Sequence, residues 1–244
     1  MDPIDLNIIL GESNPDGRGS GADIPLIQAY LKQPFPAVRI WNPNTAQLEP
    51  LEFDVNNSHT NDGNFGPELQ YATRVSMADG VRPSAMVKVT RGSSGLDPAF
   101  TYSWDPTTGV WFTNLITRVN AAIAALTTEG WTVNIRSINC SLGLNDADNA
   151  SAASNFETRF QNFVNRIYSD LSIPSTVPFV MNQLHAGADV AFLGTVITAV
   201  ANVAAVDSRI NLFSVDDMQL AADLLHWEWE EEIELGNRFY DNFS

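Results

Sequence analysis

The 244-residue chain is acidic, with a formal net charge of -16 at pH 7, and 44% of its residues are hydrophobic. This length and composition are typical of a globular protein with a sizeable core, so we expect a single domain over residues 1–244. The negative charge argues against binding to nucleic acid, whose phosphates need cations, and against binding to an anionic membrane surface.

No targeting or membrane-spanning segment is evident. The first five residues lack the basic and apolar regions of a signal peptide, and the apolar stretch at 190–206 is interrupted by polar residues. The location therefore stays open between the cytoplasm and release by another route, for instance in a virion. Cys140 is the one cysteine, which excludes an intrachain disulfide, and its apolar neighbours predict a buried, unreactive thiol.

The first strong pattern is an apolar run at residues 4–10 that stops at Gly11. It predicts a buried parallel strand. Ser13 follows the carboxyl end of this strand, where open α/β sheets bind their ligands, and it is our candidate nucleophile. The Gly-rich residues 17–21 that come next are predicted to form a mobile rim beside it.

A long polar region follows. Residues 24–31 favour a short helix, and residues 36–65 are rich in Asn, Pro and Asp. We interpret the latter as an irregular connection with short strand-like pieces at 38–41 and 51–53, which is typical of a functional loop or lid.

The rest of the chain alternates between apolar runs and amphipathic segments. Strands alternating with helices predict a parallel sheet that is covered on both faces. Further strands are expected at 84–90, 131–142, 177–184 and 210–215, and further helices at 66–77, 114–126, 150–171, 189–206 and 228–239.

Acyl transfer by a serine needs a general base, an acid that orients the base, and donors for the oxyanion. His226 lies three residues after Asp223, and this pair could supply the base and the acid. Spacing alone favours a helix-capping Asp beside a surface His. His185, which follows the 177–184 strand, is the alternative base or a substrate contact, and His59 is expected to be exposed.

Two residues could donate hydrogen bonds to the oxyanion. Gly66 offers an unhindered backbone amide at a helix start, and Asn145 offers a side-chain amide after the third strand. Each signal is weak alone, because a Gly-Leu-Asn-Asp sequence is more often a turn.

Taken in chain order, these segments resemble the Ser, Gly, Asn and His blocks of the SGNH (GDSL-like) hydrolases. The sialate O-acetylesterase and acetylxylan esterase branch is the most similar, since it typically shows Gly-Gln-Ser-Asn, Gly-Pro-Glu-Leu and a late Leu-Gly-x-Arg. The segments are Gly-Glu-Ser-Asn at 11–14, Phe-Gly-Pro-Glu-Leu at 65–69, Gly-Leu-Asn-Asp at 143–146, Asp-Leu-Leu-His at 223–226 and Leu-Gly-Asn-Arg at 235–238.

The resemblance implies that Ser13 is the nucleophile, His226 the general base and Asp223 its orienting acid. It also implies an oxyanion hole formed by Gly66, Asn145 and the amide of Ser13, and it requires neither a metal nor an organic cofactor. Four further residues are candidates for substrate binding: Glu12, Asn14, Arg91 and His185.

The sequence departs from the branch at three places. Glu12 replaces the usual Gln, Pro15 replaces the usual Met, and residues 142–146 lack the Gln-Gly-Glu-Ser-Asp pattern. These changes keep the triad but leave the substrate open.

Two other patterns attract attention. Glutamates at 228–234 are predicted to form a solvated helix face, complementary to the helix dipole, and not a metal site. Four tryptophans lie in or beside predicted loops, where they either stack on a sugar or anchor the loops: Trp41, Trp104, Trp111 and Trp227.

We therefore expect an SGNH-type three-layer α/β/α sandwich with a mostly parallel, five-stranded, flavodoxin-like sheet. The predicted function is an esterase that removes O-acetyl groups, from a carbohydrate, through an acyl-enzyme, with an acetylated carbohydrate or other small ester as its partner. The alternatives are a broad-specificity or lipolytic esterase with the same triad, and a non-catalytic carbohydrate-binding or structural module of a larger assembly.

Overall fold

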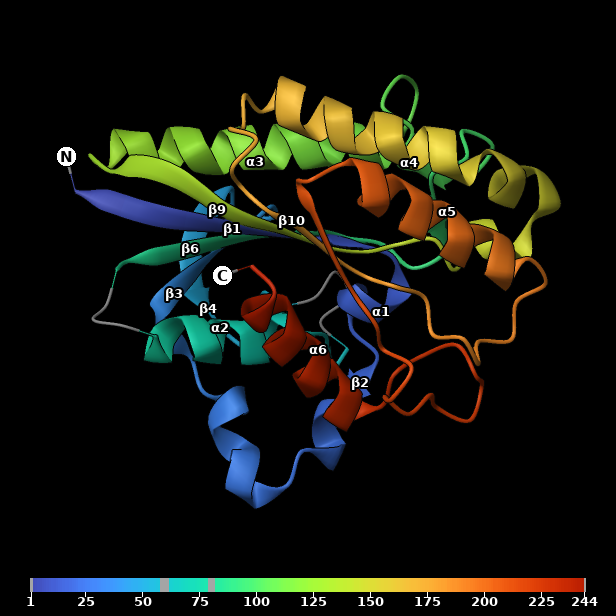
Figure 1. Ribbon diagram of the computed structural model, residues 1–244. Coiled ribbons are helices and arrows are strands. Elements are labelled where there is room, and N and C mark those ends of the chain that lie inside the picture. The colour runs from blue at the N-terminus through green and yellow to red at the C-terminus, as the bar shows by residue number, and fades with distance from the viewer. Residues whose placement is uncertain (1, 58–61, 79–81, 244) are drawn as a thin grey trace.

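A seven-stranded sheet forms the centre of the computed structural model, which describes residues 2–57, 62–78 and 82–243 (Figure 1). The strand order is β11-β10-β9-β1-β6-β3-β4, and every neighbouring pair is parallel except β3 and β4. The strands are β1 (Pro3–Gly11), β3 (Phe35–Asn42), β4 (Gln47–Leu51), β6 (Ser84–Thr90), β9 (Thr132–Ser141), β10 (Phe179–Asn182) and β11 (Ile210–Phe213).

Helices cover both faces of this sheet. Figure 1 shows α3, α4 and α5 on one side and α2 and α6 on the other. The helices are α1 (Ser13–Asp16), α2 (Glu68–Met77), α3 (Val110–Thr128), α4 (Ala150–Asp170), α5 (Leu193–Val206) and α6 (Trp229–Asp241), with 3-10 turns η1 (Gly21–Asp23), η2 (Leu26–Lys32) and η3 (Asp146–Asp148). No helix among the described residues is long and apolar enough to cross a membrane.

The expected three-layer fold is confirmed, but the sheet has seven strands and not five. The five predicted strands lie side by side in the flavodoxin-like order β6-β1-β9-β10-β11. The two others, β3 and β4, form an antiparallel hairpin beyond β6, within the predicted irregular connection of residues 36–65. The strand-like piece predicted at 38–41 lies within β3, whereas the piece at 51–53 overlaps β4 only at Leu51. Pro36 and Pro50 obscured these strands in the sequence, and proline is tolerated near a sheet edge because fewer backbone N–H groups are needed there.

The Gly-rich residues 17–21, which are predicted to form a mobile rim beside Ser13, are packed against the body. Gly17, Gly19 and Gly21 are buried, and β2 (Gly19–Ser20) pairs with β5 (Asn64–Phe65). The four tryptophans are also buried, with at most 8% of their surface exposed, so they offer no stacking platform. Trp41 lies in β3 and Trp111 in α3, whereas Trp104 and Trp227 lie in loops that they anchor. His59 lies outside the described residues.

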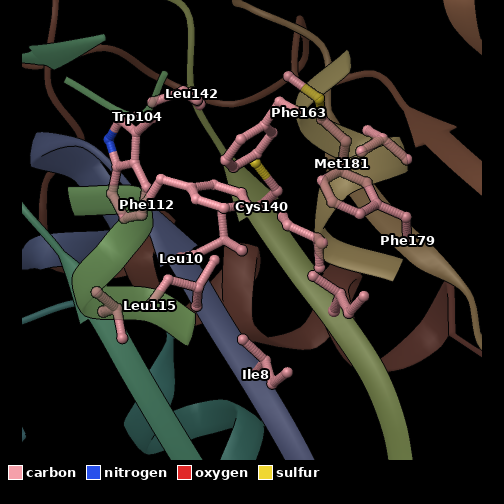
Figure 2. Packing of buried hydrophobic residues seen from close by; sticks show 14 of the residues in the cluster. Ile8, Leu10, Trp104, Phe112, Leu115, Cys140, Leu142, Phe163, Phe179 and Met181 are labelled. Atoms are coloured by element: carbon pink, nitrogen blue, oxygen red, sulfur yellow. The ribbon is translucent and has the colours of Figure 1, made fainter. Parts of the chain in front are cut away.

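The core is divided by the sheet into two clusters because side chains of a strand alternate between its faces. Leu6, Ile8 and Leu10 of β1 belong to the cluster under α3, α4 and α5, whereas Ile9 belongs to the cluster under α2 and α6. Figure 2 shows the first cluster, in which Cys140 lies among aromatic and aliphatic side chains. Burial raises the pKa of its thiol well above the ordinary range, as expected for an unreactive cysteine.

Asn7 interrupts the apolar pattern of β1 on the face under α2 and α6. Its Oδ1 accepts a hydrogen bond from Tyr71 Oη at 2.8 Å, and its Nδ2 donates to Ser84 Oγ at 2.9 Å. Tyr71 Oη also lies 2.9 Å from Ser137 Oγ. All four side chains are buried, so each depends on the others for its hydrogen bonds.

Replacing Tyr71 by Phe is expected to lower the free energy of unfolding by roughly 1–3 kcal/mol, because buried polar atoms lose a partner. Urea unfolding measures this change. Tyr30→Phe is the matched control, since Tyr30 is 45% exposed and makes one long hydrogen bond, of 3.4 Å, to Gln70. Equal destabilisation by the two variants would contradict a structural role for the Asn7 network.

Candidate functional site

The candidate nucleophile lies directly after the central strand. Gly11 ends β1 with a φ of +144°, and a Cβ atom there would lie 2.0 Å from the Ser141 carbonyl oxygen, so only glycine fits. Glu12 N donates to Ser141 O at 3.0 Å, which holds the turn against β9. Ser13 thereby becomes the first residue of the single-turn helix α1 (Figure 1).

Three side chains form a continuous hydrogen-bonded chain at this point. Ser13 Oγ lies 2.9 Å from His226 Nε2, and His226 Nδ1 lies 2.6 Å from Asp223 Oδ2. Burial by itself raises the pKa of Asp223, but hydrogen bonds from the His226 ring and from two backbone N–H groups outweigh it and lower the pKa to about 2. The ionised carboxylate favours the tautomer with a proton on Nδ1, which leaves Nε2 free to accept the serine proton.

The loop that carries His226 is held by the residue after Ser13. Asn14 Nδ2 donates to Leu225 O at 3.3 Å, and Asn14 Oδ1 accepts from Trp227 N at 3.2 Å. Leu224 has a φ of +57°, which turns the chain so that Asp223 lies beside the imidazole. Asn14 was a candidate substrate contact; it is buried and braces the histidine loop.

A cavity of about 280 Å³ opens over Ser13 and His226. Its polar wall includes one guanidinium, from Arg18, and the carboxylates of Asp148 and Asp189. The lining residues are Ser13, Arg18, Ser93, Leu144, Asn145, Asp148, Asp189, Val190, Leu225 and His226.

The site lies where the strand order reverses, because β1 is flanked by β6 on one side and β9 on the other. Ser13 follows β1, Ser93 follows β6, Asn145 follows β9 and His226 follows β11. Open α/β sheets bind ligands at this position, at the carboxyl ends of their strands.

A family model described as carbohydrate esterase, sialic acid-specific acetylesterase matches residues 3–244. The chain belongs to this family. Membership makes it a carbohydrate esterase of the carboxylic ester hydrolases and agrees with the resemblance expected from its motifs. A comparison with curated protein sequences finds no match.

Solved structures with the same fold include a carbohydrate acetylesterase. A protein of Arabidopsis thaliana is 15% identical, with a TM-score of 0.77, over 99% of this chain and 100% of that one. NanS is 14% identical, with a TM-score of 0.69, over 98% and 96% of the two chains. A carbohydrate acetylesterase from Xanthomonas citri is 14% identical, with a TM-score of 0.61, over 96% of this chain and 55% of that one.

Three predicted site residues of this carbohydrate esterase lie elsewhere, since none of them lines the cavity. Gly66 donates its amide to the Glu68 carboxylate, 3.2 Å away, and His185 Nδ1 accepts from Gly187 N at 2.9 Å. His185 Nε2 lies 3.1 Å from Met218 O, so both ring nitrogens are occupied. The guanidinium of Arg91 lies over the Tyr102 ring, 4.1 Å from its centroid.

Sequence reasoning missed two neighbours of Ser13. A Cβ atom on Gly92 would lie 3.8 Å from Ser13 Cβ and 2.8 Å from Arg18 Nη2. Gly92 follows β6, the strand beside β1, and this place in the predicted sheet is the signal that points to it. Arg18 stands within the Gly-rich residues 17–21, where the sequence pattern gives no sign of a site residue.

Glu12 points away from the cavity, into the protein. It is 2% exposed, and its carboxyl oxygens accept hydrogen bonds from Leu144 N at 2.6 Å and Asn145 N at 3.1 Å. It also contacts Asn145 Nδ2. Burial, aided by the nearby Asp146, raises the pKa of Glu12 from 4.5 to about 8, although these hydrogen bonds oppose the shift. Glu12 therefore supports the Asn145 loop and does not face substrate.

A second set of buried charges holds the far end of α1. Lys88 Nζ donates to Glu68 Oε2 at 2.7 Å and to Asp16 O at 3.0 Å. The glutamate run of α6 is not wholly solvated as expected, because Glu232 turns inward and is fully buried. Its carboxyl has no hydrogen-bond partner of good geometry among the described residues, although the backbone N–H of Arg18 approaches it. Burial and the nearby Glu68 raise its pKa well above the ordinary range.

These buried acids make stability depend on pH. Glu12, with a pKa of about 8, Asp146, with one of about 7, and Glu232 bind protons more tightly in the folded chain than in the unfolded one. Their contribution to the free energy of unfolding is therefore greatest below the ordinary carboxyl pKa and falls as pH rises toward 8.

We expect Glu232→Gln to lose less stability than the parent between pH 5 and pH 8 and to be the more stable of the two at pH 8, because a glutamine has no buried carboxyl to ionise. Denaturant unfolding at the two pH values measures it. Glu230→Gln, at an exposed position of the same helix, is the control and should follow the parent. If all three proteins lost the same stability, Glu232 would be ionised without cost in the folded chain.

Proposed function

We propose that this protein removes O-acetyl groups from a carbohydrate by way of an acetyl-enzyme on Ser13. The observation that carries the proposal is the unbroken Ser13–His226–Asp223 chain, with contacts of 2.9 and 2.6 Å, at the wall of a cavity. Family membership supports the substrate class.

The proposed reaction has two halves. As Ser13 Oγ attacks the acetyl carbonyl carbon, His226 Nε2 takes the hydroxyl proton, and Asp223 stabilises the imidazolium. Collapse of the tetrahedral intermediate breaks the bond to the sugar oxygen, which receives the proton from His226. Water, deprotonated by His226, then attacks the acetyl-serine and releases acetate and free Ser13.

The oxyanion needs hydrogen-bond donors within reach of Ser13. The Ser13 N–H is one, since the first N–H groups of a helix have no partner within it. We assign the Gly92 N–H as the second, in place of Gly66, whose amide is occupied by Glu68. Asn145, which lines the cavity, is the third, once one of its two side-chain amide hydrogens leaves its present acceptor, Glu12 or Ser94.

The cavity wall supports a polar substrate over a lipid ester. Arg18, Asp148 and Asp189 form no ion pair in the described part of the chain, and their polar groups are available to sugar hydroxyls. A long acyl chain would desolvate these charges without replacing their hydrogen bonds. Activity that rises with acyl length, measured on p-nitrophenyl esters from acetate to octanoate, would favour the lipolytic alternative.

Ser13→Ala is expected to reduce acetate release from acetylated xylan and from p-nitrophenyl acetate by at least about 10³-fold, and His226→Ala by a similar factor. His185→Ala is the matched control and should retain most activity, because His185 contacts Met218 and Gly187 and not Ser13. Thermal unfolding of each variant separates loss of fold from loss of chemistry. An unchanged rate in Ser13→Ala would end the nucleophile assignment, and an inactive parent would favour a non-catalytic module.

A further inference from the structure

Asn145 lines the cavity, yet both hydrogens of its side-chain amide are already committed. Asn145 Nδ2 donates to Ser94 O at 3.0 Å and contacts Glu12 Oε2. A primary amide nitrogen carries two hydrogens, so none is left for an oxyanion in this arrangement. The hydrogen bond to one of these two acceptors must break before the Asn145 side chain can donate to an oxyanion.

Glu12 is the acceptor that can change its strength. An ionised carboxylate accepts a charge-assisted hydrogen bond from Asn145 Nδ2, roughly twice as strong as a neutral one. A protonated carboxyl is a weaker acceptor, whereas the Ser94 carbonyl does not titrate. The ionised form also places a negative charge on the residue before Ser13, close to where the acetyl oxygen becomes an oxyanion.

Among the described residues, the groups that act most strongly on Glu12 include no cation. Asp146 faces it from η3, Cys140 faces it from β9, and His226 lies beyond Ser13. Asp146 is itself buried, and its carboxyl accepts from Leu96 N and Asp97 N. Burial raises the pKa of Glu12 to about 8, so that its proton is exchanged close to neutral pH.

We propose that Glu12 is a positioning residue that controls the oxyanion hole: protonated Glu12 releases an Asn145 Nδ2 hydrogen to the substrate, and ionised Glu12 withholds it. This rests on the proposed function, because it assigns an oxyanion role to Asn145. On this proposal, the glutamate that replaces the usual glutamine before Ser13 makes the activity depend on pH, and the activity falls as Glu12 ionises at alkaline pH.

The decisive measurement is the cost of Asn145→Ala in kcat at two pH values, with p-nitrophenyl acetate as the probe. We expect a loss of about 10²-fold at pH 6.5, typical of a missing oxyanion donor, and a loss at least fivefold smaller at pH 9.5, where ionised Glu12 already withholds the amide. Unfolding curves at both pH values confirm that each protein is folded during the assay.

The same measurement is repeated in a Glu12→Gln background, because a glutamine cannot ionise. In this background the parent's decline in kcat above pH 8 should disappear, and Asn145→Ala should cost the same factor at both pH values. A merely structural Glu12 would lower activity or stability without removing the alkaline decline.

The outcomes separate the two proposals. If Ser13→Ala is inactive but the cost of Asn145→Ala does not change with pH, the control by Glu12 is overturned and the esterase proposal stands. If Ser13→Ala matches the parent, the esterase proposal itself fails.

Discussion

The parallel pairing of β1 with both β6 and β9 is the constraint from which the site follows. Gly11 is paired with Thr90 on one side and Ser141 on the other, so the three strands end at the same level. Their carboxyl ends bring residues that are far apart in the chain to one edge of the sheet. The close approach of Gly11 to the Ser141 carbonyl then leaves no room for any side chain, and the chain turns at once into α1.

Side chains near Ser13, the proposed nucleophile, hold the site together, and they do so from the buried side. Asn14 uses both side-chain atoms to fix the loop that carries His226. Lys88 holds the other end of α1 through the Asp16 carbonyl, and Thr90 Oγ1 donates to Asp16 Oδ1 at 2.7 Å. The helix α1 is thus tied both to β6 and to the loop that carries His226, within a few residues of Ser13. Such preorganisation is what acyl transfer requires, because the reacting groups must meet without further ordering.

Some of the chain's acidic side chains are buried in its interior. Glu12, Asp146 and Glu232 are buried with few or no cations beside them, and burial raises the pKa of each. Acids whose pKa is strongly raised by burial cluster at functional sites, where a group that exchanges its proton near neutral pH is useful. Glu12 adjoins Ser13 in the chain, whereas Glu232 lies under the Gly-rich strand β2, so the same property need not have the same purpose at both places.

The sequence by itself determined the alternation of strands and helices, the position of β1, and the blocks that carry Ser13, Asn145, Asp223 and His226, because these depend on local patterns and fixed motifs. It did not determine the edge hairpin of β3 and β4, whose prolines and polar residues are typical of a loop until β6 offers a partner. It also did not determine that the amide of Gly66 serves Glu68, that Arg18 and not Arg91 lines the cavity, or that Glu12 and Glu232 are buried. Those outcomes depend on which side chains compete for the same hydrogen bonds and the same space, and only the tertiary structure decides that competition.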